Sequence, residues 1–288
     1  MEQVDIIAEG LHFPEGPVVM PDGSCIVVEL AAGRITRCWN GRKEVIAQPG
    51  GGPNGAAIGP DGALYVCNAG GLDLERFQSR TGPGAEGRIE RIDLATGKVE
   101  RLYERCGDLV LSAPNDLVFD SAGGLWFTDL GKRYNRLAET GGLYHCQADG
   151  SAITPIFTHP ISYNGVGLSP DGGTVYVADS FQARLYAFAA KAEKQRPRLI
   201  ATAPGMVELD SLAVTAAGHI CVGTLRQGGI TTFTPDGQSR HQPFDDPFVT
   251  NIAFGGEDMR DAWITLSTSG RLIRTRWDEP GLRLAFNA

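Results

Sequence analysis

The sequence predicts an all-β fold, a six-bladed β-propeller with four antiparallel strands in each blade. Three observations predict it: one sequence unit recurs six times, each copy contains two short apolar runs, and a turn rich in Asp and Gly separates these runs. A unit of about 40–50 residues that supplies four strands is typical of propellers. The composition does not shift along residues 1–288, so we expect a single propeller domain.

Each copy begins with a polar residue and supplies the first two strands of one blade. The six copies are Pro14–Leu30, Pro53–Asn68, Pro114–Asp129, Tyr163–Asp179, Leu209–Thr224 and Thr250–Leu266. Tight hairpins are expected where the turn chemistry favours them, at Asp22-Gly23, Asp61-Gly62 and Asp171-Gly172.

Two further strands follow the paired runs in most copies. The predicted third and fourth strands are Arg34–Trp39 and Lys43–Gln48 in the first copy, Gly87–Asp93 and Lys98–Tyr103 in the second, and Gly142–Gln147 and Thr154–Thr158 in the third. Xaa-Gly pairs at the joints, such as Asn40-Gly41, are strong hairpin signals.

The sixth copy has one clear further strand, Arg271–Trp277. Its fourth strand could be the C-terminal Leu282–Phe286 or the N-terminal Val4–Leu11. We expect Val4–Leu11, because pairing the first strand with the last blade closes the ring and protects the sheet edges.

The composition narrows the classes of partner. The formal net charge is −8 and no basic stripe is present, which disfavours nucleic acid and anionic membranes. Met1–Phe13 has neither the basic start nor the long apolar run of a signal peptide or membrane span. The six cysteines include no CxxC pair, so neither a disulfide framework nor a zinc site is expected. We therefore expect a cytoplasmic protein and leave its oligomeric state open.

One polar residue stands at the start of each first strand. We call these the lead residues: Glu15, Asn54, Asn115, Asn164, Asp210 and Asn251. First strands line the channel of a propeller, so the lead residues should converge at one end of it. Any one of them alone could be an ordinary turn residue. Together they offer carboxylate and amide oxygens, as a hard divalent cation prefers, and include neither His nor Cys. We predict a pocket for one divalent cation.

The loops after the second strands should rim this pocket, and two are long: Ala69–Glu86 and Leu130–Thr140. In the second loop, Arg133 and Tyr134 are candidate contacts for a substrate that carries carboxylate or hydroxyl groups. The alternative is that they are solvated loop residues. Asn54 and Asn251 form the wall of the same pocket and are further candidate substrate contacts.

These motifs resemble those of the senescence marker protein/gluconolactonase/regucalcin family of six-bladed propellers. The match covers essentially the whole chain and rests on PEGP at Pro14–Pro17, PND at Pro114–Asp116, ISYNG at Ile161–Gly165 and the segment Leu209–Gly218. The resemblance implies a metal held by Glu15, Asn164 and Asp210. Asn115 matches a further Asn that binds either the metal or the substrate.

The resemblance also implies an enzyme, a lactonase that opens a sugar lactone or a related ring. Calcium is the first choice of metal, with zinc, manganese and magnesium left open. Asp210 would take a proton from metal-activated water as general base, or would attack the substrate directly. Ala113 stands where some family members have an Arg that grips the sugar, so that anchor is missing and the identity of the lactone is open.

Two alternatives to a lactonase remain at the level of sequence. The related diisopropylfluorophosphatase-like propellers use a similar Glu/Asn/Asn/Asp calcium set, so the site could belong to a metal-dependent phosphotriesterase. A non-enzymatic propeller that binds calcium or another ligand is the second. A serine hydrolase is not supported, because the chain has no Gly-x-Ser-x-Gly elbow.

Overall fold

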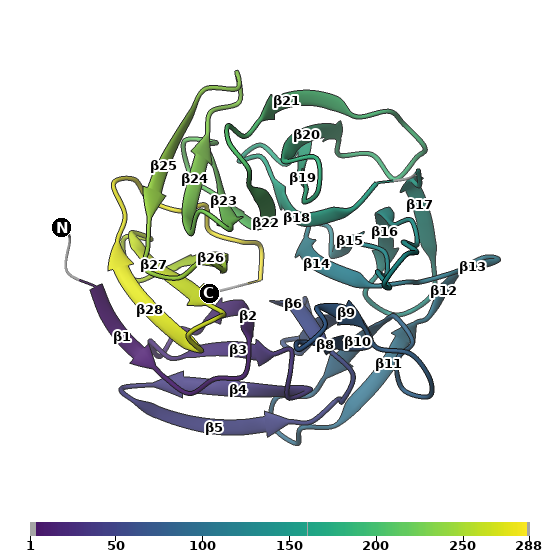
Figure 1. Cartoon of the computed structure of the whole chain (residues 1–288), viewed down its shortest axis with the longest axis horizontal. Coiled ribbons are helices and arrows are strands. Elements are labelled where there is room, and N and C mark those ends of the chain that lie inside the picture. The colour runs from purple at the N-terminus through teal and green to yellow at the C-terminus, as the bar shows by residue number, and fades with distance from the viewer. Residues whose placement is uncertain (1–3, 160, 287–288) are drawn as a thin grey trace.

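Six four-stranded antiparallel sheets are arranged around a central axis (Figure 1). The computed structural model describes residues 4–159 and 161–286, so the first three residues of the predicted N-terminal segment Met1–Phe13 lie outside the described residues. This arrangement confirms the predicted six-bladed propeller. Within the described ranges, no helix is long and apolar enough to cross a membrane.

Blades 1 to 5 follow the chain, each from an inner first strand to an outer fourth strand (Figure 1). Blades 1 and 2 consist of β2 (Pro14–Val19), β3 (Cys25–Glu29), β4 (Arg34–Trp39), β5 (Arg42–Ala47), β6 (Pro53–Ile58), β7 (Leu64–Asn68), β10 (Arg88–Ile92) and β11 (Val99–Tyr103). Blade 3 consists of β14 (Pro114–Phe119), β15 (Gly124–Asp129), β16 (Gly142–Gln147) and β17 (Ile153–Phe157).

Blades 4 and 5 consist of β18 (Tyr163–Leu168), β19 (Thr174–Asp179), β20 (Arg184–Ala189), β21 (Arg198–Thr202), β22 (Glu208–Val214), β23 (Ile220–Leu225), β24 (Gly229–Phe233) and β25 (Ser239–Pro243). Neighbouring first strands contact one another around the whole ring. They form the wall of the central channel.

Blade 6 joins the two ends of the chain. It consists of β26 (Val249–Gly255), β27 (Asp261–Leu266), β28 (Arg271–Arg276) and β1 (Val4–Ala8). β1 pairs with β28, with Ile6 opposite Ile273. The expected closure by the N-terminal strand is confirmed, since a strand at this edge satisfies the backbone groups that β28 would otherwise expose.

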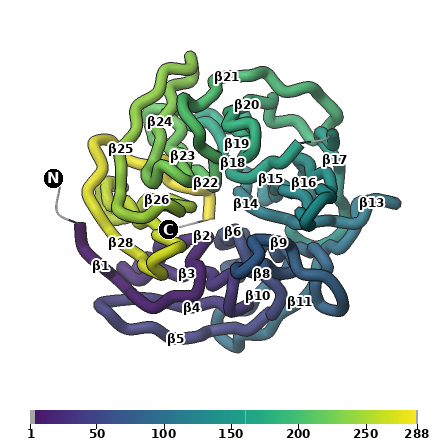
Figure 2. Tube along the Cα trace, viewed as in Figure 1, coloured from purple at the N-terminus to yellow at the C-terminus, as the bar shows by residue number. Residues whose placement is uncertain are grey.

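The C-terminal segment Leu282–Phe286, the alternative fourth strand, runs toward the middle of the ring instead (Figure 2). Leu282 N donates to Val214 O of blade 5 at 2.8 Å. The Phe286 ring packs edge-on against Phe119 of blade 3, with centroids 5.8 Å apart. The segment therefore spans the channel at the end where the first strands finish, which we call the far end.

The predicted hairpins follow the expected turn chemistry. Asn40 and Gly41 have φ of 46° and 74°, the pair of left-handed residues that a type I′ turn requires. Two short hairpins were not predicted: β8 (Leu72–Asp73) with β9 (Gln78–Ser79), and β12 (Arg105–Cys106) with β13 (Leu109–Val110). The first belongs to the long loop of blade 2.

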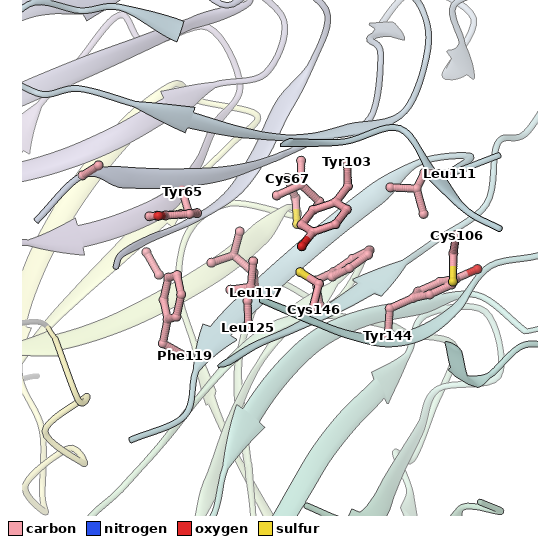
Figure 3. Close-up of a cluster of buried hydrophobic side chains, with 14 residues drawn as sticks. Tyr65, Cys67, Tyr103, Cys106, Leu111, Leu117, Phe119, Leu125, Tyr144 and Cys146 are labelled. Atoms are coloured by element: carbon pink, nitrogen blue, oxygen red, sulfur yellow. The ribbon is translucent and has the colours of Figure 1, made fainter. Parts of the chain in front are cut away.

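Apolar side chains fill the spaces between neighbouring blades. Figure 3 shows one such cluster, in which Tyr65 and Cys67 of blade 2 meet Leu117, Phe119 and Cys146 of blade 3. Tyr65 and Phe119 pack edge-on with ring centroids 5.0 Å apart. All six cysteines are buried free thiols. The core thus fixes each inner strand against the next, and with it the lead residue that the strand carries.

Candidate metal centre

Each lead residue lies at or beside an irregularity of its strand. In all six blades the pairing of the first and second strands shifts register there, for example between Glu15 and Val18 in β2. A β-bulge bends its strand and redirects the local side chains. Each lead residue is at most 8% exposed. Six polar side chains are therefore buried at the end of the channel where the first strands begin, which we call the mouth.

Direct contacts join lead residues of neighbouring blades. The Asn251 amide donates to Glu15 Oε2 at 3.0 Å, which links blade 6 to blade 1. Ser211 Oγ donates to Asn164 Oδ1 at 3.4 Å, and Asn164 also hydrogen-bonds Asp210, which links blades 4 and 5. The structure thus brings Glu15 to Asn251 and Asn164 to Asp210.

Glycine after the lead residue lets the inner strands approach one another. A Cβ on Gly55 would lie 2.6 Å from Asp116 Oδ1, and a Cβ on Gly165 would lie 2.6 Å from the carbonyl oxygen of Asp210. Real Cβ atoms do not come this close to other atoms. The missing side chains therefore provide the space in which the polar groups of the site meet.

Asp116 is a third buried carboxylate of this site and was not among the predicted site residues. It is 6% exposed, and its Oδ2 accepts a hydrogen bond from Val166 N of blade 4 at 3.3 Å. A signal was present in the repeat, because Gly follows the lead residue in blades 1, 2 and 4 but Asp follows Asn115 in blade 3. A charged side chain at a position where neighbouring inner strands come close together indicates that the surroundings of this position differ from those in the other blades.

Burial dominates the electrostatics of the three carboxyls. It raises the pKa of Glu15 to about 7, although hydrogen bonds from Asn251 and from Gly16 N oppose the shift. Burial, with the nearby Glu15 charge, raises the pKa of Asp116 to about 7. The same two causes place the pKa of Asp210 well above its ordinary value. No Lys, Arg or His among the described residues contributes to these shifts.

The residues present fit a hard cation. Asn54 Oδ1 and Asn115 Oδ1 are buried and have no hydrogen-bond partner in the described part of the chain, although buried amide oxygens are normally bonded. Buried carboxylates without a positive partner are unfavourable, and a divalent ion would compensate them. In residues 4–159 and 161–286, no group of three or more His, Cys, Asp or Glu stands at metal-binding spacing. A site in these ranges would therefore need amide oxygens as well as carboxylates, the mixture that the lead residues supply.

Arg133 and Tyr134, the two predicted substrate contacts in the second long loop, have different partners. The Arg133 guanidinium stacks on the Phe181 ring of blade 4, 3.4 Å from its centroid. The Tyr134 hydroxyl donates to Glu139 Oε1 at 3.1 Å within its own loop. The two long loops are joined, because Ser79 N donates to Arg133 O at 2.8 Å and Arg133 N donates to Ser79 Oγ at 3.0 Å. They therefore form one connected structure at the mouth.

A buried ion pair anchors the loop that carries the β8–β9 hairpin. Arg88 Nε donates to Glu90 Oε1 at 2.5 Å, and both side chains are 1% exposed. Asn68 Nδ2 donates to Glu90 Oε2 at 2.8 Å, and Arg88 donates to the carbonyl oxygens of Pro49 and Glu86. This network fixes both ends of the loop to blade 2.

A cavity of about 450 Å³ occupies the channel on the far side of the lead residues. Asp116 and Asn251 line its inner end, and Leu282 and Leu284 of the C-terminal segment line its other end. The wall between them comes from the inner strands of all six blades. The lead residues therefore lie between this cavity and the loops of the mouth.

Comparison with known proteins gives relatives that match most of the chain. It is similar to the gluconolactonase of Zymomonas mobilis, with 24% identity over 95% of this chain and 81% of that protein. It is also similar to lactonase drp35 of Staphylococcus epidermidis, with 29% identity over 63% of this chain and 50% of that protein.

Solved structures agree in fold. A gluconolactonase from Xanthomonas campestris superposes with a TM-score of 0.77 at 23% identity, covering 96% of this chain and 89% of that one. The calcium-binding protein regucalcin from Agrobacterium tumefaciens superposes with a TM-score of 0.76 at 23% identity, covering 98% of both chains. The family model of the SMP-30/gluconolactonase/LRE-like region matches residues 13–268. With this match, the predicted resemblance is confirmed, and the chain belongs to the SMP-30/gluconolactonase/LRE-like family.

Proposed function

We propose that this protein is a divalent-metal-dependent hydrolase that opens the ring of a sugar lactone or a related lactone. The observation that carries the proposal is that three buried carboxyls, Glu15, Asp116 and Asp210, interact electrostatically and have no positive partner among the described residues. The unpaired oxygens of Asn54 and Asn115 add to it. The relatives named gluconolactonase and lactonase support lactone as the substrate class. The calcium-binding regucalcin supports a divalent cation, with calcium as the first choice.

Four lead residues would hold the cation: Glu15, Asn115, Asn164 and Asp210. A divalent ion at this place would polarise the lactone carbonyl and lower the pKa of a bound water. Asn251 holds the Glu15 carboxylate through its 3.0 Å hydrogen bond. Asp116 connects blade 3 to Val166 of blade 4 behind the site.

Asp210 is the proposed catalytic residue. As general base it would accept the proton of the attacking water, and its ionised form is the one that performs this role. Direct attack by its carboxylate on the carbonyl carbon would instead form a covalent acyl intermediate. The substrate would lie toward the mouth, with Asn54, Asn251 and Arg133 as proposed contacts. Tyr134 is a further proposed contact, for which its hydroxyl would give up the hydrogen bond to Glu139 and bind the substrate instead.

The test is a panel of lactones and organophosphates, assayed with EDTA and then with calcium, magnesium, manganese or zinc restored. We expect lactone hydrolysis that EDTA abolishes and one of these metals restores. Asp210→Asn should lower kcat by about a hundredfold or more, and Glu15→Gln should also weaken metal binding. The matched control Asp149→Asn changes an exposed turn carboxylate and should leave kcat unchanged.

Each alternative has its own result in this panel. Turnover of an organophosphate with none of any lactone would replace the proposal with a phosphotriesterase. Metal binding without turnover of either class would replace it with a binding protein. Full lactone turnover by Asp210→Asn would refute the role of Asp210, whereas a trapped acyl group on Asp210 would select direct attack over general-base catalysis.

A further inference from the structure

Three phenylalanine rings gather at the mouth of the channel, and the proposed chemistry does not use them. The rings of Phe13 and Phe248 are 6.3 Å apart, and those of Phe77 and Phe248 are 5.4 Å apart. Phe13 lies two residues before Glu15, and Phe248 lies three residues before Asn251. Phe13 and Phe248 therefore precede, by a few residues, the two lead residues that a hydrogen bond joins between blades 1 and 6.

The third ring reaches this place from another blade. Phe77 belongs to the β8–β9 hairpin of blade 2, which the Ser79–Arg133 hydrogen bonds tie to the second long loop. The buried Arg88–Glu90 pair holds the base of the same loop. The hairpin thus presents Phe77 from a fixed support rather than from a free loop. We call Phe13, Phe77 and Phe248 the aromatic wall.

The backbone of this wall is strained. Phe13 has φ of 57° and Phe77 has φ of 53°, in the left-handed region that bulky residues avoid. Glycine or asparagine would adopt this conformation more easily. Strained residues that persist in a fold concentrate at functional sites. Two of the three wall residues therefore keep large rings where the backbone alone would favour a small residue.

The exposure of Phe77 also argues against a purely structural role. A ring that served only to fasten the loop would be buried, but Phe77 is 50% exposed. Half of its surface is therefore open to solvent and free to be covered by a ligand. A bound apolar group would cover that surface with a favourable free energy, whereas sugar hydroxyls placed against it would lose hydrogen bonds to water.

We infer that the aromatic wall recognises an apolar substituent on the lactone ring, so that the preferred substrate is an alkyl- or aryl-substituted lactone. This inference rests on the proposed function and adds the substrate class to it. The wall determines specificity. It contacts the part of the substrate that does not react, while the carbonyl group faces the lead residues.

The test compares two lactones with the same reacting ring, unsubstituted γ-butyrolactone and γ-octalactone, together with gluconolactone. We expect kcat/KM for γ-octalactone to exceed that for γ-butyrolactone by about tenfold or more. Phe77→Asn removes the ring and suits a left-handed backbone, and it should reduce this selectivity ratio toward one, mainly through KM. Phe77→Leu keeps an apolar group and should retain part of the ratio.

Leu74→Asn is the matched control, because Leu74 is an exposed apolar residue of the same hairpin and is 42% exposed. It should preserve the native ratio. An equal loss of selectivity in Leu74→Asn and Phe77→Asn would overturn the role of the wall. Hydrolysis of all three lactones without preference for the alkyl group would overturn this inference alone. Absence of hydrolysis of every lactone would overturn the proposed function and this inference with it.

Discussion

Without the proposed cation, the free energy of unfolding of this protein should decrease as the pH rises. The folded-state pKa of Glu15 is about 7, against an ordinary value of 4.5. Between these two values the folded protein retains a proton that the unfolded chain has lost. The free energy of unfolding should therefore fall as the pH rises through this window. The difference for Glu15 corresponds to about 3 kcal/mol.

Asp116 acts in the same direction, since its pKa is also raised to about 7. Its contribution does not simply add to that of Glu15, because the Glu15 charge is one cause of its shift. A bound divalent cation favours the ionised carboxylates and should remove the slope. The stabilisation by calcium should therefore grow as the pH rises from about 4.5 to about 7.

The measurement is the free energy of unfolding in urea, from about pH 4.5 to about pH 8, with EDTA and with calcium. Glu15→Gln should lose part of the slope in EDTA, because the glutamine does not titrate and the Glu15 charge no longer raises the pKa values of Asp116 and Asp210. The rest of the slope should remain, because burial is the main cause of the raised pKa of both Asp116 and Asp210. A free energy of unfolding in EDTA that stays constant or rises across this window would refute the reasoning. A Glu15→Gln variant with the full native slope would refute it as well.

Two further predictions concern the scaffold of the site. Arg88→Met should destabilise the fold by about 3–5 kcal/mol in urea unfolding, because it leaves Glu90 buried and unpaired. The double variant Arg88→Met/Glu90→Leu should recover much of that loss. An Arg88→Met variant as stable as the native protein would contradict this reasoning. Gly165→Ala should cost more than about 1 kcal/mol and weaken calcium binding measured by calorimetry, because its Cβ would lie 2.6 Å from the Asp210 carbonyl oxygen. An unchanged calcium affinity and an unchanged free energy of unfolding would contradict this prediction, because blades 4 and 5 would then be able to move apart without cost. Gly173→Ala is the matched control, since Gly173 is outside the left-handed region and its Cβ would make only ordinary contacts, the nearest at 3.4 Å from Asp171 Oδ1.

The fold could be predicted from the sequence because each blade repeats the same local signals. Polar residues such as Asn54 and Asn164 stand at equivalent positions, and turns such as Asn40-Gly41 have only one favourable geometry. The closure by Val4–Ala8 followed from the need to cover the edge of the last blade. The short hairpins were missed because strands of two residues carry no periodicity.

The site could be predicted only in part. The lead residues were found because they repeat. Asp116 departs from the repeat only by replacing a Gly, and its place in the site is defined by its contacts with Gly55 and Val166 of other blades. The contact between Arg133 and Phe181 joins two loops that no sequence pattern relates. The metal-binding and catalytic roles remain predictions, because they depend on a ligand and not on the fold.

The pairing of β1 with β28 has a consequence for how the chain folds. Val4 lies opposite Thr275, so the last blade cannot be completed until the chain has left the ribosome past β28. Contacts between residues so distant in sequence slow folding. Until they form, the edge of β28 and the apolar faces through which blades 1 and 6 pack stay open to other molecules. Nascent chains should therefore be most prone to aggregate at the stage when five blades are present and β1 has not yet paired with β28.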